Sequence, residues 1–236
     1  MAEFNMVEAK TEEKREAKKI TVYSFVAKKI SILDEENSWS KAMLAKLRRA
    51  IGKQPGATPE IWAITLTDAP ESWRGAYNKI ASGNVDKSYD WLDGCIKPSY
   101  AEYAVHVALT LYALHRQGSD KSVNLSGKSK DGKYLGNSIG GAAAMLVKPD
   151  GSNLNAVKNR FDKMATAVDF NELAYHARGI VQMLESKNKM DYPRFASDLF
   201  AYQIPGRADE IRLRWGEDFY RVLYSNSKNG EEGELL

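Results

Sequence analysis

Five cations between Trp39 and Lys53 are the residues of this chain whose types and spacing most clearly suggest chemistry. In this segment, WSKAMLAKLRRAIGK, the cations have no local partner, because no acidic residue lies between Glu36 and Glu60. Cations of this kind are suited to neutralising phosphates of a nucleic-acid backbone. A solvated basic face that serves only solubility would show the same pattern, so both interpretations stay open. The five cations are Lys41, Lys46, Arg48, Arg49 and Lys53.

A helix is the element that would hold these cations on one side of the chain. On a helical wheel the cations spread over one face and the apolar residues gather on the other. Gly52, followed by QPG, gives a suitable end. We therefore expect an amphipathic helix over 39–51 with a basic outer face. Its apolar residues are Met43, Leu44, Leu47, Ala50 and Ile51.

A second arginine-rich segment, IRLRWGEDFYR at 211–221, mixes arginines with aromatic residues, as nucleic-acid-binding segments do. On a helical wheel its aromatic residues fall on an apolar stripe, which favours a core over base stacking. Arg214 has Asp218 four residues on, and Arg221 has Glu217 four residues before it, so two of the three arginines have helical partners. Arg212 lacks an obvious one. The pattern favours a structural helix, with an apolar stripe of Ile211, Trp215, Phe219, Val222 and Leu223.

The segment QGSDKSVNLSGKSKDGKYLG, 117–136, is rich in Gly, Ser, Lys and Asp. We expect a hinge or mobile loop that packs no core. Its lysines follow Arg116 at a helix end and suit non-specific phosphate contact, since flexible lysines act as point charges. A solvated linker is the simpler interpretation of the loop taken alone. The lysines concerned are Lys121, Lys128, Lys130 and Lys133.

The chain shows no pattern of residues typical of an enzyme. GNSIGGAAA at 136–144 lacks the spacing of a phosphate-binding loop and is more typical of close helix packing. The three histidines, His106, His115 and His176, form no ligand cluster or catalytic relay, and Cys95 has no activating neighbour in the sequence. We expect a protein without catalytic residues, cofactor or metal.

Composition and periodicity together indicate an all-α protein. The chain has 236 residues, 43% of them hydrophobic, and its apolar residues recur at intervals of three and four. One cysteine excludes an intramolecular disulfide, and no stretch approaches the roughly 18 apolar residues of a membrane span, so we expect a cytoplasmic protein without membrane contact. Helices are predicted over 14–33, 39–51, 58–65, 70–82, 85–92, 99–117, 134–147, 152–165, 169–186, 192–202 and 207–224.

The predicted helices form a two-part helical bundle of about nine to eleven helices. We expect an N-terminal extension and first helix at 1–36, an N-terminal helical subdomain at 37–125, a C-terminal helical bundle at 126–226 and an acidic tail at 227–236. The net charge of +3 is unevenly distributed, because both ends hold more acidic than basic residues. The body between them is therefore more basic than the total suggests.

Six segments in fixed order along residues 38–224 form a distinctive set. They are LAKLRRAIGKQPGATPEIW (44–62), VALTLYALHRQG (107–118), YLGNSIGGAAAML (134–146), NRFDKMATAVDFNELAYHARGIVQML (159–184), MDYPRFASDLFAYQ (190–203) and IRLRWGEDFYR (211–221). Together they resemble the CasB small subunit of the type I-E CRISPR surveillance complex, Cascade. The resemblance implies a two-part all-helical fold and a non-catalytic subunit present in pairs. It also implies a basic surface that helps to hold guide RNA, target strand and displaced DNA strand beside the other Cascade subunits.

Carried over by the resemblance, the basic surface falls on Arg48 and Arg49, on Arg116 and more loosely on Arg160 and Arg178. The chain departs from its relatives at YLGNSIGGAAAML, where they carry arginines in mid-helix and this chain has small residues. The lysines at 128, 130 and 133 are candidates to compensate. With Lys41 and Lys53, these residues complete the predicted nucleic-acid-binding set.

Two other functions remain alternatives to a nucleic-acid-stabilising subunit. A stand-alone helical DNA-binding regulator would need a recognition helix, and the sequence shows no short turn typical of a helix-turn-helix. A protein–protein scaffold would use the basic face to meet an acidic partner. Sequence-selective binding by the free protein would support the first, and salt-resistant association without nucleic acid would support the second.

Overall fold

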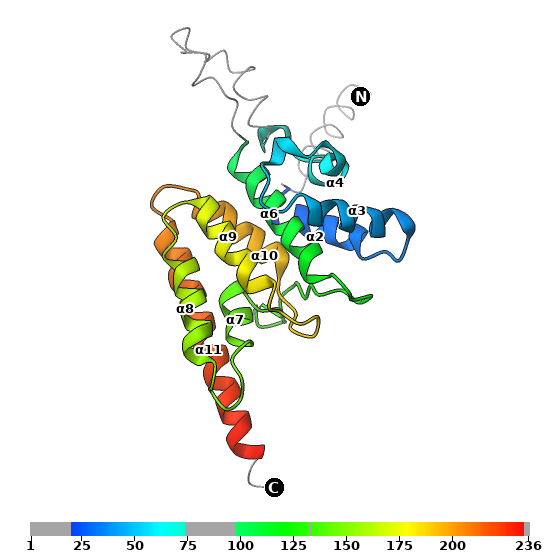
Figure 1. Ribbon diagram of the computed structural model, residues 1–236. Coiled ribbons are helices and arrows are strands. Elements are labelled where there is room, and N and C mark those ends of the chain that lie inside the picture. Colours follow the sequence, from blue (N-terminus) through cyan, green and yellow to red (C-terminus); the bar gives the residue numbers. More distant parts are fainter. Residues whose placement is uncertain (1–19, 74–97, 133, 234–236) are drawn as a thin grey trace, which may run out of the picture.

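The computed structural model describes residues 20–73, 98–132 and 134–233, with side chains described as far as Ser225. These residues form nine α-helices and only isolated β-bridges, so the predicted all-α class is confirmed (Figure 1). None of the described helices is long and apolar enough to cross a membrane. The α-helices are α2 (Val22–Leu33), α3 (Ser38–Arg49), α4 (Trp62–Thr65), α6 (Tyr100–His115), α7 (Ile139–Ala144), α8 (Leu154–Ala165), α9 (Phe170–Val181), α10 (Tyr192–Tyr202) and α11 (Ala208–Gly233).

Several predicted helix boundaries were wrong. The described helix α2 begins at Val22, where Thr21 and Ser24 form a capping box, so the helix predicted over 14–33 is interrupted before Val22, and its residues 14–19 lie outside the described residues. Residues 55–61 form two 3₁₀ turns before the short α4, and the helix expected over 134–147 is confined to α7. The helix expected over 169–186 ends at Val181. Of the one predicted over 70–82, the described part is a 3₁₀ turn, Glu71–Trp73, and the one over 85–92 lies outside the described residues, as does Cys95.

Helix α6 lies at the centre of the fold. Its own sequence carries apolar residues on nearly every face, so the helix is buried on nearly all sides. It packs against α2, α3, α9 and α10, and α10 also packs against α2. The two predicted subdomains therefore share a core, although the exact division at 125 stays a prediction. In Figure 1, α8, α9 and α11 lie on one side of α6, and α2 and α3 lie on the other.

Small residues in α7 allow that helix to lie directly against α11, as the sequence predicted. A Cβ added to Gly140 would lie 2.0 Å from the backbone oxygen of Trp215. Trp215 itself is fully buried with Ile211 and Phe219, whereas Val222 and Leu223 are partly buried against the same core, so the apolar stripe of the arginine-rich segment does face the core. Any residue larger than glycine at 140 would push the two helices apart.

The pairs predicted for the α11 arginines were wrong. Arg214 bonds to Asp198 of α10 at 2.7 Å rather than to Asp218. Arg221 bonds to Asp218 at 2.7 Å rather than to Glu217. A helical wheel identifies neighbours within one helix only, whereas the nearest carboxylate for Arg214 comes from another helix. All the same, the pairing supports the structural role expected for this segment.

Arg212, for which no partner was expected, has three. Its guanidinium pairs with Asp209 at 2.9 Å and donates to the backbone oxygen of Ala167 at 2.9 Å. It also donates to the Tyr202 hydroxyl at 2.7 Å. The segment therefore has all three arginines engaged within the fold.

The segment 117–136 is attached to the body at several points, and the expectation that it packs no core was wrong at Val123, which is fully buried. Met190 donates its backbone N–H to the oxygen of Val123 at 3.1 Å and accepts one from Leu125 at 3.1 Å. The Tyr23 hydroxyl accepts the backbone N–H of Gly127 at 2.9 Å. These bonds connect the segment to α2 and to the residues before α10.

Candidate nucleic-acid interface

The outer face of α3 carries cations because its inner face is needed for the core. Met43, Leu44 and Leu47 are buried on the inner side of the helix, and the positively charged residues before, between and after them lie on the outer side. Lys41, Arg49 and Lys53 are exposed, and Lys46 and Arg48 are half-buried. None of these five forms an ion pair with a carboxylate of the described residues. The predicted basic face therefore exists.

Arg48 is partly engaged within the fold. Its guanidinium donates to the backbone oxygen of Ala113, in the last turn of α6, at 3.3 Å. Burial lowers the pKa of Arg48, and the adjacent Arg49 lowers it further. The side chain still carries its charge at neutral pH, since the ordinary pKa of an arginine lies far above neutral. Arg49 is the more available of the two, because it is exposed and has no such bond.

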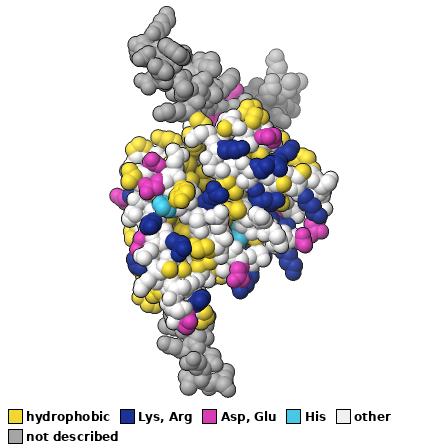
Figure 2. Space-filling view, in the orientation of Figure 1, with side chains coloured by type: hydrophobic (Ala, Val, Ile, Leu, Met, Phe, Trp, Pro, Cys, Tyr) yellow, Lys and Arg dark blue, Asp and Glu magenta, His cyan; other side chains and the backbone are white. Residues whose placement is uncertain are grey.

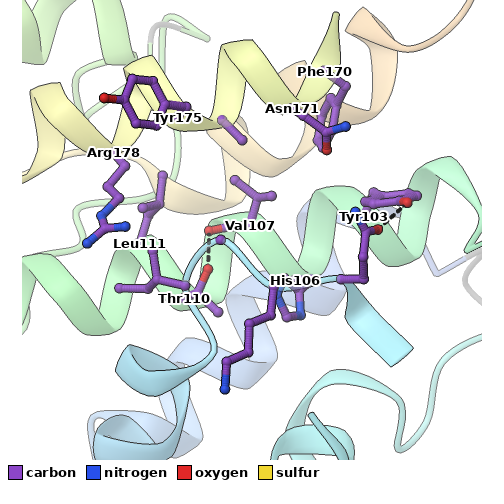
Figure 3. A pocket seen from close by; sticks show the side chains of 14 residues that line it. Tyr103, His106, Val107, Thr110, Leu111, Phe170, Asn171, Tyr175 and Arg178 are labelled. Carbon is purple, nitrogen blue, oxygen red and sulfur yellow. Dashed lines mark hydrogen bonds between the residues drawn. The ribbon is translucent and has the colours of Figure 1, made fainter. Parts of the chain in front are cut away.

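A pocket of about 310 Å³ lies between α6 and α9 and reaches the end of α3. Its apolar walls come from α6 and α9, and Lys53 and Arg178 add positive charge. In Figure 3, Arg178 and Phe170 project from α9 toward α6 at opposite ends of the pocket. The lining residues are Ile51, Gly52, Lys53, Gln54, Tyr103, His106, Val107, Thr110, Leu111, Phe170, Asn171, Ala174, Tyr175 and Arg178.

A second pocket of about 490 Å³ lies between α8 and α9 and shares Tyr175 and Arg178 with the first. It adds Arg160 and Lys163 from α8. Figure 2 shows lysine and arginine side chains over α3 and across the centre of this face toward α9 and α8. No Asp or Glu is among the described residues that line either pocket. We call the two joined pockets the basic groove; its cations are Lys53, Arg160, Lys163 and Arg178.

Carboxylates near the groove are occupied by other partners. Asp162 pairs with Lys158 on α8 at 2.5 Å, and Glu172 lies 3.7 Å from His176 on α9. Within the described part of the chain, Arg160 donates only to the backbone oxygen of Ala156 in its own helix, at 3.3 Å. The groove therefore presents positive charge that acidic side chains do not neutralise, which suits a polyanion.

His106 and His115 are buried and contact other groups of the core, a placement that the sequence left open. His106 places Nε2 3.3 Å from the backbone oxygen of Ala50, and His115 contacts the Tyr192 hydroxyl at 3.1 Å. Burial lowers the pKa of both imidazoles, which keeps them neutral at neutral pH. The described residues contain no group of His, Cys, Asp and Glu arranged to hold a metal ion.

Comparison of the sequence with models of known protein families identifies the family of this chain. The model of the CRISPR-associated protein Cse2 family matches residues 43–220, which span α3 to α11. The chain belongs to the Cse2 family. A comparison with curated proteins gave no match.

Solved structures support the same fold for this Cse2-family chain. The crystal structure of CasB from Thermobifida fusca is 26% identical with a TM-score of 0.60, covering 84% of this chain and 97% of that one. CasB from Thermus thermophilus is 20% identical with a TM-score of 0.51, covering 84% and 96%. A chain of a CRISPR RNA-guided surveillance complex is 14% identical with a TM-score of 0.55, covering 89% and 99%. The latter two show the likeness of fold alone.

Arg116 lies apart from the groove of this Cse2-family chain. Its side chain is only 7% exposed, and its guanidinium donates to the backbone oxygens of Ser119 and Asp120 just beyond α6. Asp34 lies 3.6 Å away. Because these hydrogen bonds hold the guanidinium at the end of α6, the proposed interface does not include Arg116.

The linker lysines that the structure describes, Lys121, Lys128 and Lys130, also lie outside the two pockets. Lys128 is exposed, and its ammonium lies 4.6 Å from the centre of the Tyr134 ring, on which Arg194 also packs at 4.3 Å. Lys130 is exposed as well, and Lys133 lies outside the described residues. Their binding role stays a prediction.

Two groove residues, Lys163 and Tyr175, were missed by the sequence reasoning. Lys163 follows Arg160 by three residues, so the two share a face of α8. Tyr175 is 71% exposed and lies off the buried stripe of α9, which a wheel of that helix would have shown. The signals were present within single helices, but only the packing of α8 against α9 brings them together.

Proposed function

We propose that this chain is a non-catalytic small subunit of a CRISPR RNA-guided surveillance complex of the type I-E Cascade kind, acting in the cytoplasm. Its basic groove and the outer face of α3 bind nucleic-acid backbone without reading sequence. Family membership and the fold shared with a chain of such a complex support the assembly. The observation that carries the binding role is the groove of four cations that no lining carboxylate neutralises.

Binding of this kind depends on phosphate neutralisation. Each Lys or Arg that contacts a phosphate releases counterions, so affinity falls steeply as salt rises. Sequence specificity comes from base pairing with the guide RNA rather than from the protein. The basic surface would stabilise the guide RNA, the target strand and the displaced strand while the duplex is open.

Assembly would supply the affinity for nucleic acid that one copy of the chain lacks. A second copy of this chain and the other Cascade subunits would align several weak basic faces along one strand. Linked weak sites gain affinity through effective concentration. We therefore expect weak binding by the free chain and much stronger binding by the assembled complex.

Charge reversal at the two ends of the basic surface tests the proposal. In the assembled complex, Arg49→Glu with Arg178→Glu should lower target-DNA affinity by about 10- to 100-fold at moderate salt, because two phosphate contacts are lost. The slope of log affinity against log salt should fall by about 1.4–1.8. Both residues lack ion pairs in the described structure, so the fold should be unaffected.

A matched control makes the same charge change away from the groove. Lys28→Glu with Arg207→Glu alters two exposed cations that pair with Asp68 and Glu210. This control should bind target DNA as the unmodified complex does. Unchanged affinity and salt slope in the Arg49 and Arg178 variant would sink the assignment of this surface. Sequence-selective binding by the free protein, or salt-resistant assembly without nucleic acid, would favour a regulator or a scaffold instead.

A further inference from the structure

The pocket between α6 and α9 has an apolar interior and aromatic walls, which phosphate binding alone does not require. Val107 and Leu111 line it from α6, and Ala174 lines it from α9. Tyr103 and Phe170 pack edge to face at one end, with ring centres 5.7 Å apart and an interplanar angle of 67°. In Figure 3 these two rings lie at the end opposite Arg178. Such walls are suited to a flat, weakly polar group.

Polar groups in the pocket floor are uncharged and mostly satisfied. The Thr110 hydroxyl donates to the backbone oxygen of Val107 at 3.0 Å, and the Tyr103 hydroxyl donates to Oε1 of Gln54. His106 is buried with Nε2 against the Ala50 oxygen, and its Nδ1 is the one buried polar side-chain atom among the described lining residues without a hydrogen-bond partner. A ligand group that enters here therefore meets little competing demand for hydrogen bonds and no buried charge.

The rim differs from the floor, since it is cationic and polar. Lys53 lies on the α3 side and Arg178 on the α9 side, where the pocket joins the one that holds Arg160 and Lys163. Asn171 is exposed and has no side-chain hydrogen bond to the described residues, so its amide is free to meet donors and acceptors of a ligand. The pocket therefore has an uncharged, largely apolar interior beside a cationic rim. This combination matches a nucleotide, which has a flat base and a charged phosphate.

The size of the pocket limits the ligand to one base. Small-molecule sites are about 300–1,000 Å³, and this pocket of about 310 Å³ lies at the lower end. A base in a duplex is stacked and paired, so only an unpaired base that leaves the stack reaches a pocket of this depth. Tyr175, exposed where the two pockets join, offers a ring on which the next base of a single strand would stack.

We propose that this pocket receives one unpaired nucleobase of the bound single strand, while adjacent phosphates lie on Arg178, Arg160 and Lys163. The inference rests on the proposed function and adds a base-binding site to a backbone-binding surface. Stacking and apolar contact tolerate every base, so the site grips a strand without selecting its sequence. It would favour single-stranded over double-stranded nucleic acid.

A comparison of two single strands with equal numbers of phosphates tests the pocket. The full chain at low salt is titrated with an oligonucleotide and with its abasic counterpart, which lacks bases but keeps the backbone. We expect about tenfold tighter binding of the strand with bases. Equal affinity for the two strands would overturn the pocket while leaving backbone binding intact. Because the free chain is expected to bind weakly, the titration extends to high protein concentration, and no binding of either strand even there would contradict the proposed function as well.

Two variants and a control locate the effect. Ala174→Phe fills the pocket without changing charge, and Tyr175→Ala removes an exposed ring without disturbing the core. Both should reduce the preference for bases and leave the salt slope unchanged. Ala63→Phe adds the same side chain at an exposed position of α4 outside both pockets and should behave as the unmodified chain. A full preference retained in both variants would overturn the site.

Free nucleotide is distinguished from a strand by a competition arm. Adenosine monophosphate has the same base and phosphate but only one of each. If the strand is the occupant, adenosine monophosphate should displace it only at concentrations at least about 100-fold above the strand, because the further phosphate contacts are missing. Displacement at equal concentrations would overturn the strand as the occupant.

Discussion

Arginines on α11 and on α3 are used in opposite ways. On α11, Arg212, Arg214 and Arg221 each bond to a carboxylate at 2.7–2.9 Å. On α3, Arg49 is exposed and pairs with no carboxylate of the described residues. Lys53, which follows α3, lines the groove and also pairs with no carboxylate of those residues. The comparison teaches that aromatic neighbours in the sequence do not distinguish an arginine without an ion pair from one engaged within the fold, whereas a lack of nearby carboxylates in the sequence does.

The two regions also differ in what their loss would cost. Around α11 and α10, the charges surround a buried centre in which Trp215 donates its indole N–H to Asp198 at 2.8 Å. Around α3 and the groove, the cations lie at or near the surface and form no ion pair with a carboxylate of the described residues. Stability should therefore respond to changes in the first region, and nucleic-acid binding to changes in the second.

Removal of the Trp215 side chain should give the largest effect on stability. Trp215→Ala leaves a cavity between α7, α10 and α11 and deprives Asp198 of a hydrogen bond. We expect the free energy of unfolding, measured by urea denaturation, to fall by about 3–5 kcal/mol. Leu213→Ala on the same helix is the control, because Leu213 is exposed and its loss should cost less than about 0.5 kcal/mol. Equal losses would refute the division into two regions.

Asp191 should give an intermediate effect that depends on pH. Its Oδ1 accepts the backbone N–H of Arg194 at 2.9 Å, but its buried Oδ2 has no hydrogen-bond partner in the described structure. Burial raises the pKa of Asp191 from 3.8 to about 6. Between these values the folded state binds the proton more tightly than the unfolded state, so this group stabilises the fold as pH falls and loses that contribution as pH rises through 6.

Asp191→Asn keeps the helix-capping oxygen and removes the titration. At about pH 7 the variant should be more stable than the parent by roughly 2 kcal/mol, and the difference should shrink as pH falls toward about 4. Urea denaturation of both proteins across this range measures it. A difference that stays constant with pH would show that the carboxyl group does not titrate in this window.

Arg49→Glu should have the smallest effect on stability. Arg49 is exposed, makes no ion pair with the described residues and lies beside Arg48, so the change should alter the free energy of unfolding by less than about 0.5 kcal/mol. Arg214→Gln is the contrast, because it leaves buried Asp198 without its charged partner and should cost about 1–3 kcal/mol. Thermal denaturation measures both. A large loss for Arg49→Glu would mean that α3 also needs its charges to fold.

Local periodicity was enough to predict the features that belong to one helix. The all-α class, the basic face of α3 and the buried stripe of α11 all follow from which side of a helix each residue faces. Acidic residues absent near α3 and small residues in α7 were likewise visible in the sequence. Helix ends were less predictable. A cap such as Thr21 depends on the hydrogen bonds of a few atoms, and many other serine, threonine, aspartate and asparagine residues of the sequence could cap a helix equally well.

Only the tertiary structure decided which helices meet. It placed Arg214 against Asp198 rather than Asp218, and it placed Val123 of the expected loop in the core. It also buried the Arg116 side chain, with the guanidinium bonded to backbone oxygens just beyond α6. It further joined Lys53 from the turn after α3, Arg178 from α9 and Arg160 from α8 into one groove. The physical reason is that a helix's sequence fixes the side it buries, whereas its partner is fixed by how all helices fill a common core.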